Sequence, residues 1–259
     1  MRSSAVAWLL DMYGFKVYLL VGGYKAYRKW VRSQFEKEYN FNIIGGYTGS
    51  GKTLLLHELG KQNKTIVDLE GLAHHKGSAF GAMGKQPGQE MFENRLAQAL
   101  AQSSVGNLQS AENSNGQQPT ANSIWLEDES QRIGNLQIPM PLWYTMRKSP
   151  VFFMDIPFEE RLEHIVDDYG KQKKEALEEA ILRIQKRLGG LETKTALQFL
   201  HEDNYLECFR ILLSYYDKWY QKGLHNRENI SSLLNKIPCA GVDTETNIQK
   251  LLSCNIVSA

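Results

Sequence analysis

Residues 46–53 have the composition and spacing of a loop that binds phosphate. Their sequence, G-Y-T-G-S-G-K-T, fits the pattern G-x-x-x-x-G-K-[ST], in which backbone amides approach phosphate oxygens. An apolar run at 41–44 predicts a buried strand before the loop, and 54–59 predicts a helix after it. The N-terminus of that helix adds partial positive charge. The predicted phosphate-binding residues are Gly46, Gly49, Ser50, Gly51, Lys52 and Thr53.

Lys52 can reach a terminal phosphate, and the Thr53 hydroxyl can ligate Mg²⁺. Three aspartates, Asp68, Asp128 and Asp155, lie at or near the C-terminal ends of predicted strands. Ligands of open α/β sheets bind at that edge, where a carboxylate can hold Mg²⁺ directly or through water. Asp68 and Asp128 are the preferred candidates, with Asp68 assigned to the metal beside Thr53. A structural role is an equally good interpretation of each aspartate.

Other polar residues follow the same strands. Glu70 is a further candidate for magnesium or substrate. His74 and His75 are consecutive, so they cannot share one face of a helix, but in a loop they could contact phosphate or RNA. A solvated turn is the alternative. Arg132 could bind phosphate through two parallel hydrogen bonds or form a surface ion pair with Glu129.

The chain from residue 41 alternates short apolar runs with helical patterns, which predicts an α/β fold with a P-loop NTPase-like parallel sheet. Four strands are expected, at 41–44, 65–69, 123–127 and 151–155. A helical C-terminal part follows, with helices at 158–169, 173–188, 193–200 and 205–220. Residues 103–123 are polar and predict a surface loop, with a functional lid as the alternative.

The two ends of the chain have weaker patterns. A helix at 4–12, a strand at 16–21 and an aromatic, basic helix at 24–30 cannot bury a parallel strand on both faces. This segment therefore needs a partner or must dock on the rest of the chain. From Asn235 onward the pattern predicts a loosely held tail. Four residues are expected in the core, with the lining of a hydrocarbon pocket as the alternative: Trp125, Trp143, Tyr144 and Met146.

Composition places the chain among ordinary globular proteins of one or two domains. It has 259 residues, 42% apolar and 23% charged, and a net charge of +1, which neither supports nor excludes a nucleic-acid partner. Cys208, Cys239 and Cys254 show no metal-binding spacing and predict reduced thiols. With no signal peptide and no apolar run of about 18 residues, a cytoplasmic protein without a membrane span is expected.

Taken together, these motifs resemble the bacterial tRNA 2-selenouridine synthases, in which a rhodanese domain precedes a P-loop domain. Residues 68–81, D-L-E-G-L-A-H-H-K-G-S-A-F-G, are similar to a second signature of that family, and 124–134, with Ile138-Pro139, to a third. Residues 188–190 and 215–220 are similar to its C-terminal helical part. The resemblance covers Met1 to about Leu224, and the 103–123 segment is longer than the family's usual connection.

The resemblance divides the chain into a C-terminal remnant of a rhodanese domain at 1–35, a P-loop domain with its helical region at 36–235, and a tail of unknown structure at 236–259. Arg2-Ser3-Ser4 resembles the end of a rhodanese active-site loop, C-x-x-G-x-R-S, whose cysteine would precede Met1. We therefore expect the chain to lack the rhodanese cysteine, with the missing half encoded upstream or by a neighbouring gene.

The function implied by the resemblance is that of a transferase acting on the wobble uridine of tRNA. Members move a geranyl group from geranyl diphosphate to 2-thiouridine, and then replace geranylthiol with selenium from selenophosphate. The P-loop, with Mg²⁺, suits the first step, whereas the second is associated with the rhodanese cysteine and is expected to be lost here. The substrate also makes a basic group a candidate for binding the tRNA backbone: Lys171, Lys173 and Lys174.

Two other functions remain open from the residues alone. The loop would also suit a small-molecule kinase or another NTP-using P-loop enzyme. A non-catalytic fragment that binds tRNA is the second alternative. Comparing the binding of geranyl diphosphate, ATP and tRNA separates the three.

Overall fold

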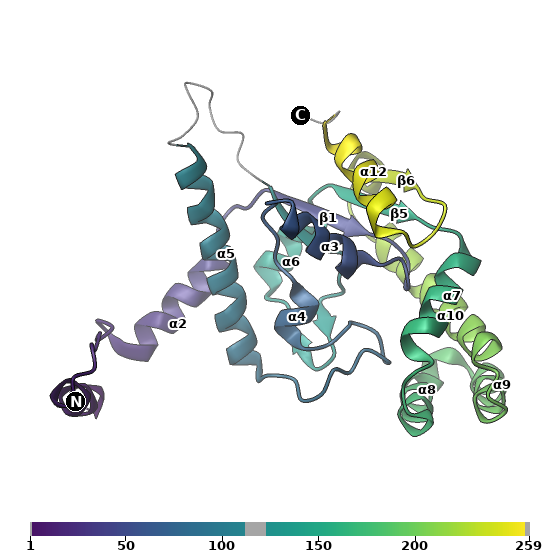
Figure 1. Cartoon of the computed structure of the whole chain (residues 1–259), viewed down its shortest axis with the longest axis horizontal. Helices are drawn as coiled ribbons and strands as arrows, with labels where there is room; N and C mark the ends of the chain where they lie inside the picture. The colour runs from purple at the N-terminus through teal and green to yellow at the C-terminus, as the bar shows by residue number, and fades with distance from the viewer. Residues whose placement is uncertain (1, 112–122, 257–259) are drawn as a thin grey trace.

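The computed structural model describes residues 2–111 and 123–256, and its centre is a parallel sheet (Figure 1). Four strands lie in the order β2-β1-β5-β6, and every neighbouring pair is parallel. The predicted α/β class, with a P-loop-like parallel sheet and a helical C-terminal part, is confirmed. The strand bounds are β1 (Phe41–Gly45), β2 (Ile124–Glu127), β5 (Val151–Asp155) and β6 (Leu234–Pro238).

Each central strand sends alternate side chains into two apolar layers, because successive side chains of a strand point to opposite faces. On β5, Val151 and Phe153 join the layer that includes α5 and α6, whereas Phe152 and Met154 join the layer that includes α3 and α12. Burial on both faces explains why these strands are continuous apolar runs. The helix bounds are α3 (Lys52–Lys61), α5 (Gln89–Ala111), α6 (Met140–Arg147) and α12 (Thr244–Ile256).

A third apolar cluster holds the helical part together and includes Leu162, Ile181, Leu200 and Phe209. Figure 1 shows α8 and α9 projecting away from the sheet, at the lower right of the view. The four predicted helices are present, although the last one continues beyond Tyr220. Their bounds are α7 (Phe158–Tyr169), α8 (Lys174–Leu188), α9 (Gly190–His201) and α10 (Tyr205–His225).

The predicted strand at 65–69 is wrong. Only Ile66 pairs in parallel, through an isolated bridge with Trp125 of β2. The chain then turns into the short helix α4 (Leu69–Ala73), because the Asp68 carboxylate caps it by accepting the Gly71 N–H at 2.6 Å. Because this cap residue directly follows the apolar run, the strand pairing is limited to Ile66.

The predicted strand at 16–21 is also wrong, while the helices on either side of it, α1 (Arg2–Met12) and α2 (Gly23–Gln34), are present. No strand in the described part of the chain pairs with 16–21, and an apolar run without a pairing partner does not become a strand. Much of α1 and the segment after it is exposed, including Trp8, Phe15 and Tyr18.

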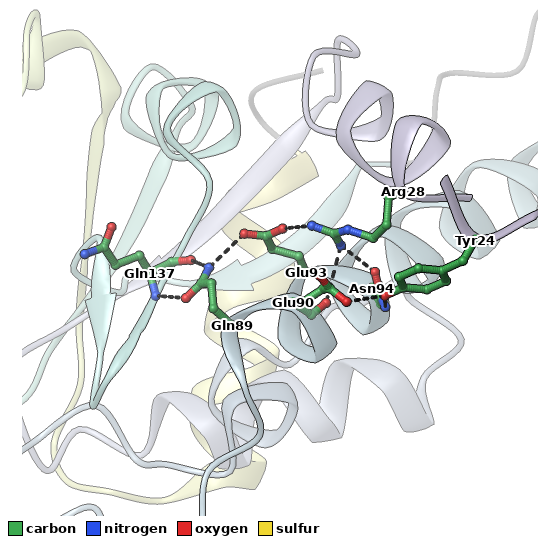
Figure 2. A network of polar contacts seen from close by, with 7 residues as sticks. All are labelled: Tyr24, Arg28, Gln89, Glu90, Glu93, Asn94 and Gln137. Carbon is green, nitrogen blue, oxygen red and sulfur yellow. Dashed lines mark hydrogen bonds and ion pairs between the residues drawn. The ribbon is translucent and has the colours of Figure 1, made fainter. Parts of the chain in front are cut away.

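Polar contacts fix α2 on α5 (Figure 2). Arg28 forms an ion pair with Glu93 and donates to Asn94, and the Tyr24 hydroxyl donates to Glu90 at 2.5 Å. Gln89 then links Glu93 to the backbone of Gln137, whose carbonyl accepts at 2.7 Å. Gln137 lies in β4 (Leu136–Gln137), which forms a small antiparallel hairpin with β3 (Arg132–Ile133).

The predicted loop at 103–123 is wrong in its first part, because α5 continues to Ala111. The remainder, 112–122, lies outside the described residues. No helix within 2–111 and 123–256 is both long and apolar enough to cross a membrane.

The predicted loose tail from Asn235 is wrong as well. Residues 234–238 pair with all of β5, so the expected boundary at 235 falls inside β6. A short helix, α11 (Ile230–Leu233), precedes this strand, and α12 packs on α3 after it. The polar sequence L-N-K-I-P did not predict a strand. β6 lies at the edge of the sheet, and an edge strand does not need to be apolar throughout.

Stability measurements can check that α12 belongs to the core. Leu251 is fully buried against the α3 layer, so Leu251→Ala should lower the free energy of unfolding by about 2–5 kcal/mol. Urea denaturation followed by circular dichroism measures the change, and Ser253→Ala, an exposed change on the same helix, is the matched control. A loss below about 0.5 kcal/mol for Leu251→Ala would show that the end of the chain unfolds independently.

Candidate functional site

The phosphate-binding loop connects the end of β1 to the start of α3, as the sequence predicted. Gly49 has φ +82°, and a Cβ there would lie 2.7 Å from the Ile165 side chain, so this position requires glycine. Gly51 (φ +69°) is the N-cap of α3 and has no side chain to occupy the first backbone N–H groups of the helix. These N–H groups and the positive end of the helix dipole form an anion site.

Lys52 and Thr53 supply the polar side chains next to this anion site. The Lys52 ammonium folds back over the loop and donates to the Gly46 carbonyl at 2.9 Å. The Thr53 hydroxyl donates to Glu70 Oε2 at 2.9 Å. The structure therefore brings Glu70, rather than Asp68, into contact with the predicted magnesium ligand.

Three glutamates lie near Lys52: Glu127 is buried, and Glu70 and Glu129 are partly buried. Glu127, the last residue of β2, is completely buried, and neither of its carboxylate oxygens has a hydrogen-bond partner among the described residues. Burial, reinforced by repulsion from Glu70 and Asp68, raises the pKa of Glu127 to about 8. Burial also raises the pKa of Glu70 and of Glu129, which repel each other. Lys52 is attracted to all three glutamates but does not pair with any of them directly.

Glu127 is the residue that the sequence analysis missed, because it preferred the neighbouring Asp128. Adjacent residues at the end of a strand point in opposite directions, so only one of them can face the P-loop acids. The sequence did contain a signal for Glu127, because it is the first acidic residue directly after the apolar run Ile-Trp-Leu.

Asp128 instead anchors a chain of contacts that holds the loop. Its carboxylate accepts the Tyr220 hydroxyl at 2.6 Å and forms an ion pair with Arg227. The same Tyr220 oxygen accepts the Gly46 N–H at 3.1 Å. Burial and the adjacent Asp128 raise the pKa of Tyr220 well above its ordinary value, so the phenol stays protonated. Asp128 thereby positions the start of the loop through α10.

A second link from α10 reaches the middle of the loop. Arg161 of α7 is buried, donates to the Thr48 carbonyl at 3.1 Å, and binds Asp217 of α10 through two hydrogen bonds of 2.9 and 2.7 Å. Its guanidinium also lies 4.7 Å from the centre of the Tyr47 ring. The helical part of the chain thus fixes the loop at two points.

The remaining sequence candidates lie in different surroundings. Asp68 uses its carboxylate to cap α4 and to contact His57 at 2.8 Å. His74 is exposed and lies against the Lys85 carbonyl, whereas His75 is buried, and burial with the nearby Arg183 lowers its pKa. The two histidines therefore lie in different surroundings. Arg132 lies in β3 and donates to the Gly134 carbonyl.

The three basic candidates differ in their freedom to bind RNA. Lys171 and Lys173 are exposed in the turn between α7 and α8. Lys174, at the start of α8, forms an ion pair of 2.5 Å with Asp203. A phosphate contact at Lys174 would have to compete with that carboxylate.

The donor set at Thr53 is made of oxygen atoms. Within residues 2–111 and 123–256, no group of three or more His, Cys, Asp or Glu side chains is arranged to hold a metal ion alone. Mg²⁺ commonly takes one or two protein carboxylates and completes its shell with phosphate oxygens and water. Thr53 and Glu70 fit that kind of shared site.

Comparison with known proteins places the chain in one family. The family model described as the tRNA 2-selenouridine synthase AAA domain matches residues 39–236. The chain is similar to tRNA 2-selenouridine synthase of Shewanella frigidimarina (strain NCIMB 400), at 32% identity over 249 residues, which cover 83% of this chain and 63% of the relative. The corresponding protein of Serratia proteamaculans (strain 568) is 39% identical over 173 residues, 65% of this chain and 42% of the relative. The chain thus spans about 63% of the Shewanella relative's length.

The buried Glu127 carboxyl should make stability depend on pH. The folded-state pKa of about 8 lies above the ordinary 4.5. The contribution of Glu127 to the free energy of unfolding is therefore complete below about pH 4.5 and is lost as the pH rises towards 8. Glu127→Gln should remove that loss, which has a slope of up to about 1.4 kcal/mol per pH unit. Urea titrations between about pH 5 and 8 in EDTA measure it, with the exposed Glu163→Gln as control. Parallel pH profiles for the wild type and Glu127→Gln would contradict the raised pKa.

Proposed function

We propose, from the premise that the chain belongs to the family of tRNA 2-selenouridine synthase AAA domains, that it is a transferase that modifies the wobble uridine of tRNA. The observation that supports this most directly is the P-loop itself, in which an uncapped α3 N-terminus, Lys52 and Thr53 lie together at the sheet edge. Such a site binds a diphosphate or a longer polyphosphate.

We assign to this site the transfer of a geranyl group from geranyl diphosphate to 2-thiouridine. The thiocarbonyl sulfur attacks C1 of the geranyl group, the C1–O bond breaks, and diphosphate leaves with the bonding electrons. No protein nucleophile is needed, but negative charge grows on the leaving diphosphate. In this proposal, the backbone N–H groups of α3 and the Lys52 ammonium stabilise that charge.

Magnesium is proposed as the cofactor, held by the Thr53 hydroxyl and Glu70, which already contact each other at 2.9 Å. When bound, Mg²⁺ supplies positive charge to the diphosphate oxygens. The nearby Glu127 carboxyl is completely buried, and because its pKa is raised to about 8 it can give up its proton and become charged when a cation enters this part of the site. Asp68 adds negative charge to this part of the site, because its carboxylate at the start of α4 repels both Glu70 and Glu127.

The replacement of geranylthiol by selenium from selenophosphate is assigned to a rhodanese cysteine rather than to this site. Burial raises the pKa of the Cys208 thiol to about 12 and also raises that of Cys239, so neither forms a thiolate readily. The exposed apolar side chains of α1, such as Trp8, support the further proposal that a rhodanese-type domain, from the same chain or another, covers residues 1–35.

Loss of the P-loop cation tests the proposed transfer. Lys52→Ala should slow geranyl transfer to 2-thiouridine tRNA by roughly 10²–10³-fold, because one preorganised charge is removed from the leaving diphosphate. Lys61→Ala, which removes an exposed ammonium at the other end of α3, is the matched control. Mass spectrometry of digested tRNA measures the product. Unchanged transfer by a folded Lys52→Ala variant would rule out the role, and tighter binding of ATP than of geranyl diphosphate would favour a kinase.

Salt dependence tests the tRNA contact. Changing Lys171 and Lys173 to alanine together should lower the slope of log K against log salt by up to about 2, since each phosphate contact releases about one counterion. Lys174→Ala should change the slope less, because its ammonium is already paired with Asp203. Filter binding at several salt concentrations measures the slopes. An unchanged slope in the double variant would place the tRNA on another surface.

A further inference from the structure

One tryptophan of α10 has its side chain exposed close to the phosphate loop. Trp219 is 44% exposed, although tryptophan is highly buried on average in folded proteins. The next residue, Tyr220, accepts the Gly46 N–H, and Gln221 donates to the Tyr47 hydroxyl at 2.7 Å. The exposed indole therefore belongs to the same segment of α10 that holds the loop.

Two cations and a second aromatic ring surround the Trp219 indole. The guanidinium of Arg187, in the last turn of α8, lies 5.8 Å from the centre of the indole ring, and the Lys222 ammonium lies 5.3 Å from it. Tyr215, one turn earlier on α10, packs edge-to-face at 6.3 Å between ring centres. These contacts join α8 to α10. We call the surface formed by Tyr215, Trp219, Arg187 and Lys222 the aromatic patch.

The aromatic patch carries positive charge that no carboxylate in the described part of the chain neutralises. Residues four apart on a helix share a face, so Arg183 lies beside Arg187 on α8, and Lys218 lies beside Lys222 on α10. None of these four side chains forms an ion pair within residues 2–111 and 123–256. By contrast, Arg210 of α10 pairs with two glutamates. The patch is therefore a local positive surface on a chain whose net charge is only +1.

An exposed indole among unpaired cations matches the chemistry of single-stranded nucleic acid. Proteins that bind such strands stack unpaired bases on aromatic rings and contact the backbone phosphates with Lys and Arg. A duplex offers no free base face, because its bases stack on one another. A protein partner would need a carboxylate for each cation, whereas an RNA strand brings one phosphate with every nucleotide. Charge complementarity therefore favours a single-stranded segment of RNA.

We propose that the aromatic patch binds the single-stranded loop of tRNA that carries the wobble uridine, with one base stacked on Trp219 and the flanking phosphates on the cations of α8 and α10. This inference rests on the proposed function and adds the surface that holds the RNA loop beside the phosphate site. Arg187 and Lys222 now lie against the indole, so the incoming base displaces one of them. Both side chains are long and have no carboxylate partner among the described residues, so the displaced cation can turn to a phosphate.

The affinity of the full chain for an anticodon stem-loop RNA tests the stacking contact. Trp219→Ala should weaken binding by about tenfold or more, because one base loses its stacking partner. Trp219→Phe should retain part of the affinity, since a phenyl ring also stacks. Neither variant should change the slope of log K against log salt, because no charge is removed. Leu206→Ala, at an apolar side chain of α10 that is 42% exposed, is the matched control. Fluorescence anisotropy measures the binding.

The slope itself tests the cations. Changing Arg187 and Lys222 to alanine together should lower it by up to about 1.4, since each phosphate contact of a single strand contributes about 0.7. The matched control changes two exposed cations of α2, Lys25 and Lys29, to alanine. Helix α2 lies at the opposite end of the molecule in Figure 1, so this pair should leave the slope unchanged.

The outcomes separate the aromatic patch from the function on which it rests. If the wild type binds the stem-loop and Trp219→Ala binds it equally well, the patch proposal is overturned and the proposed tRNA modification stands. A change only in the sedimentation of Trp219→Ala would assign the patch to a protein contact. Equal weakening of a fully paired RNA duplex would overturn base stacking. If the wild type binds neither the stem-loop nor tRNA, the proposed function fails as well. Circular dichroism reports folding, and the slope of the Arg187 and Lys222 variant decides the matter should Trp219→Ala not fold.

Discussion

The Tyr220 hydroxyl joins the phosphate loop, the end of β2 and helix α10. The Tyr220 oxygen accepts the Gly46 N–H from the phosphate loop and donates its own proton to Asp128, beyond the end of β2. Tyr220 itself belongs to α10, which carries the helical part. Arg227 pairs with the same aspartate and keeps its charge balanced in a buried setting. The position of the loop therefore depends on a residue far along the sequence, not only on the strand and helix that flank it.

Acidic side chains outnumber the single ammonium of Lys52 beside the phosphate loop. Glu70, Glu127 and Glu129 have raised pKa values because burial and mutual repulsion disfavour their charged forms. A diphosphate would bring further negative charge next to them, and Lys52 alone is one positive charge. The arrangement is thus suited to an anion that arrives together with a cation, in which case the glutamates become partners of the cation instead of repelling the phosphate.

Local patterns predicted the phosphate loop well, because the loop, its strand and its helix are adjacent in the sequence and each is encoded locally. They failed where the outcome depends on distant partners. The apolar run at 16–21 is not a strand, because no described strand pairs with it, whereas the polar run at 234–238 is one, because β5 offers it a full edge. Asp128 does lie at the end of β2, as predicted, but its contacts with Tyr220 and Arg227 come from α10 and beyond, which no spacing near residue 128 reveals.

The segment at 75–82 connects the phosphate site to the helical part. It follows α4, whose Glu70 contacts Thr53, and its Phe80 lies among the aromatic side chains of α7 and α10. The same segment forms an ion pair of 2.7 Å between Lys76 and Asp168 of α7. The residues between Glu70 and Phe80 therefore join the acidic group beside the phosphate loop to the apolar cluster of the helical part. Because the helical part also supplies the Tyr220 anchor, it is as much a component of the phosphate site as the sheet is.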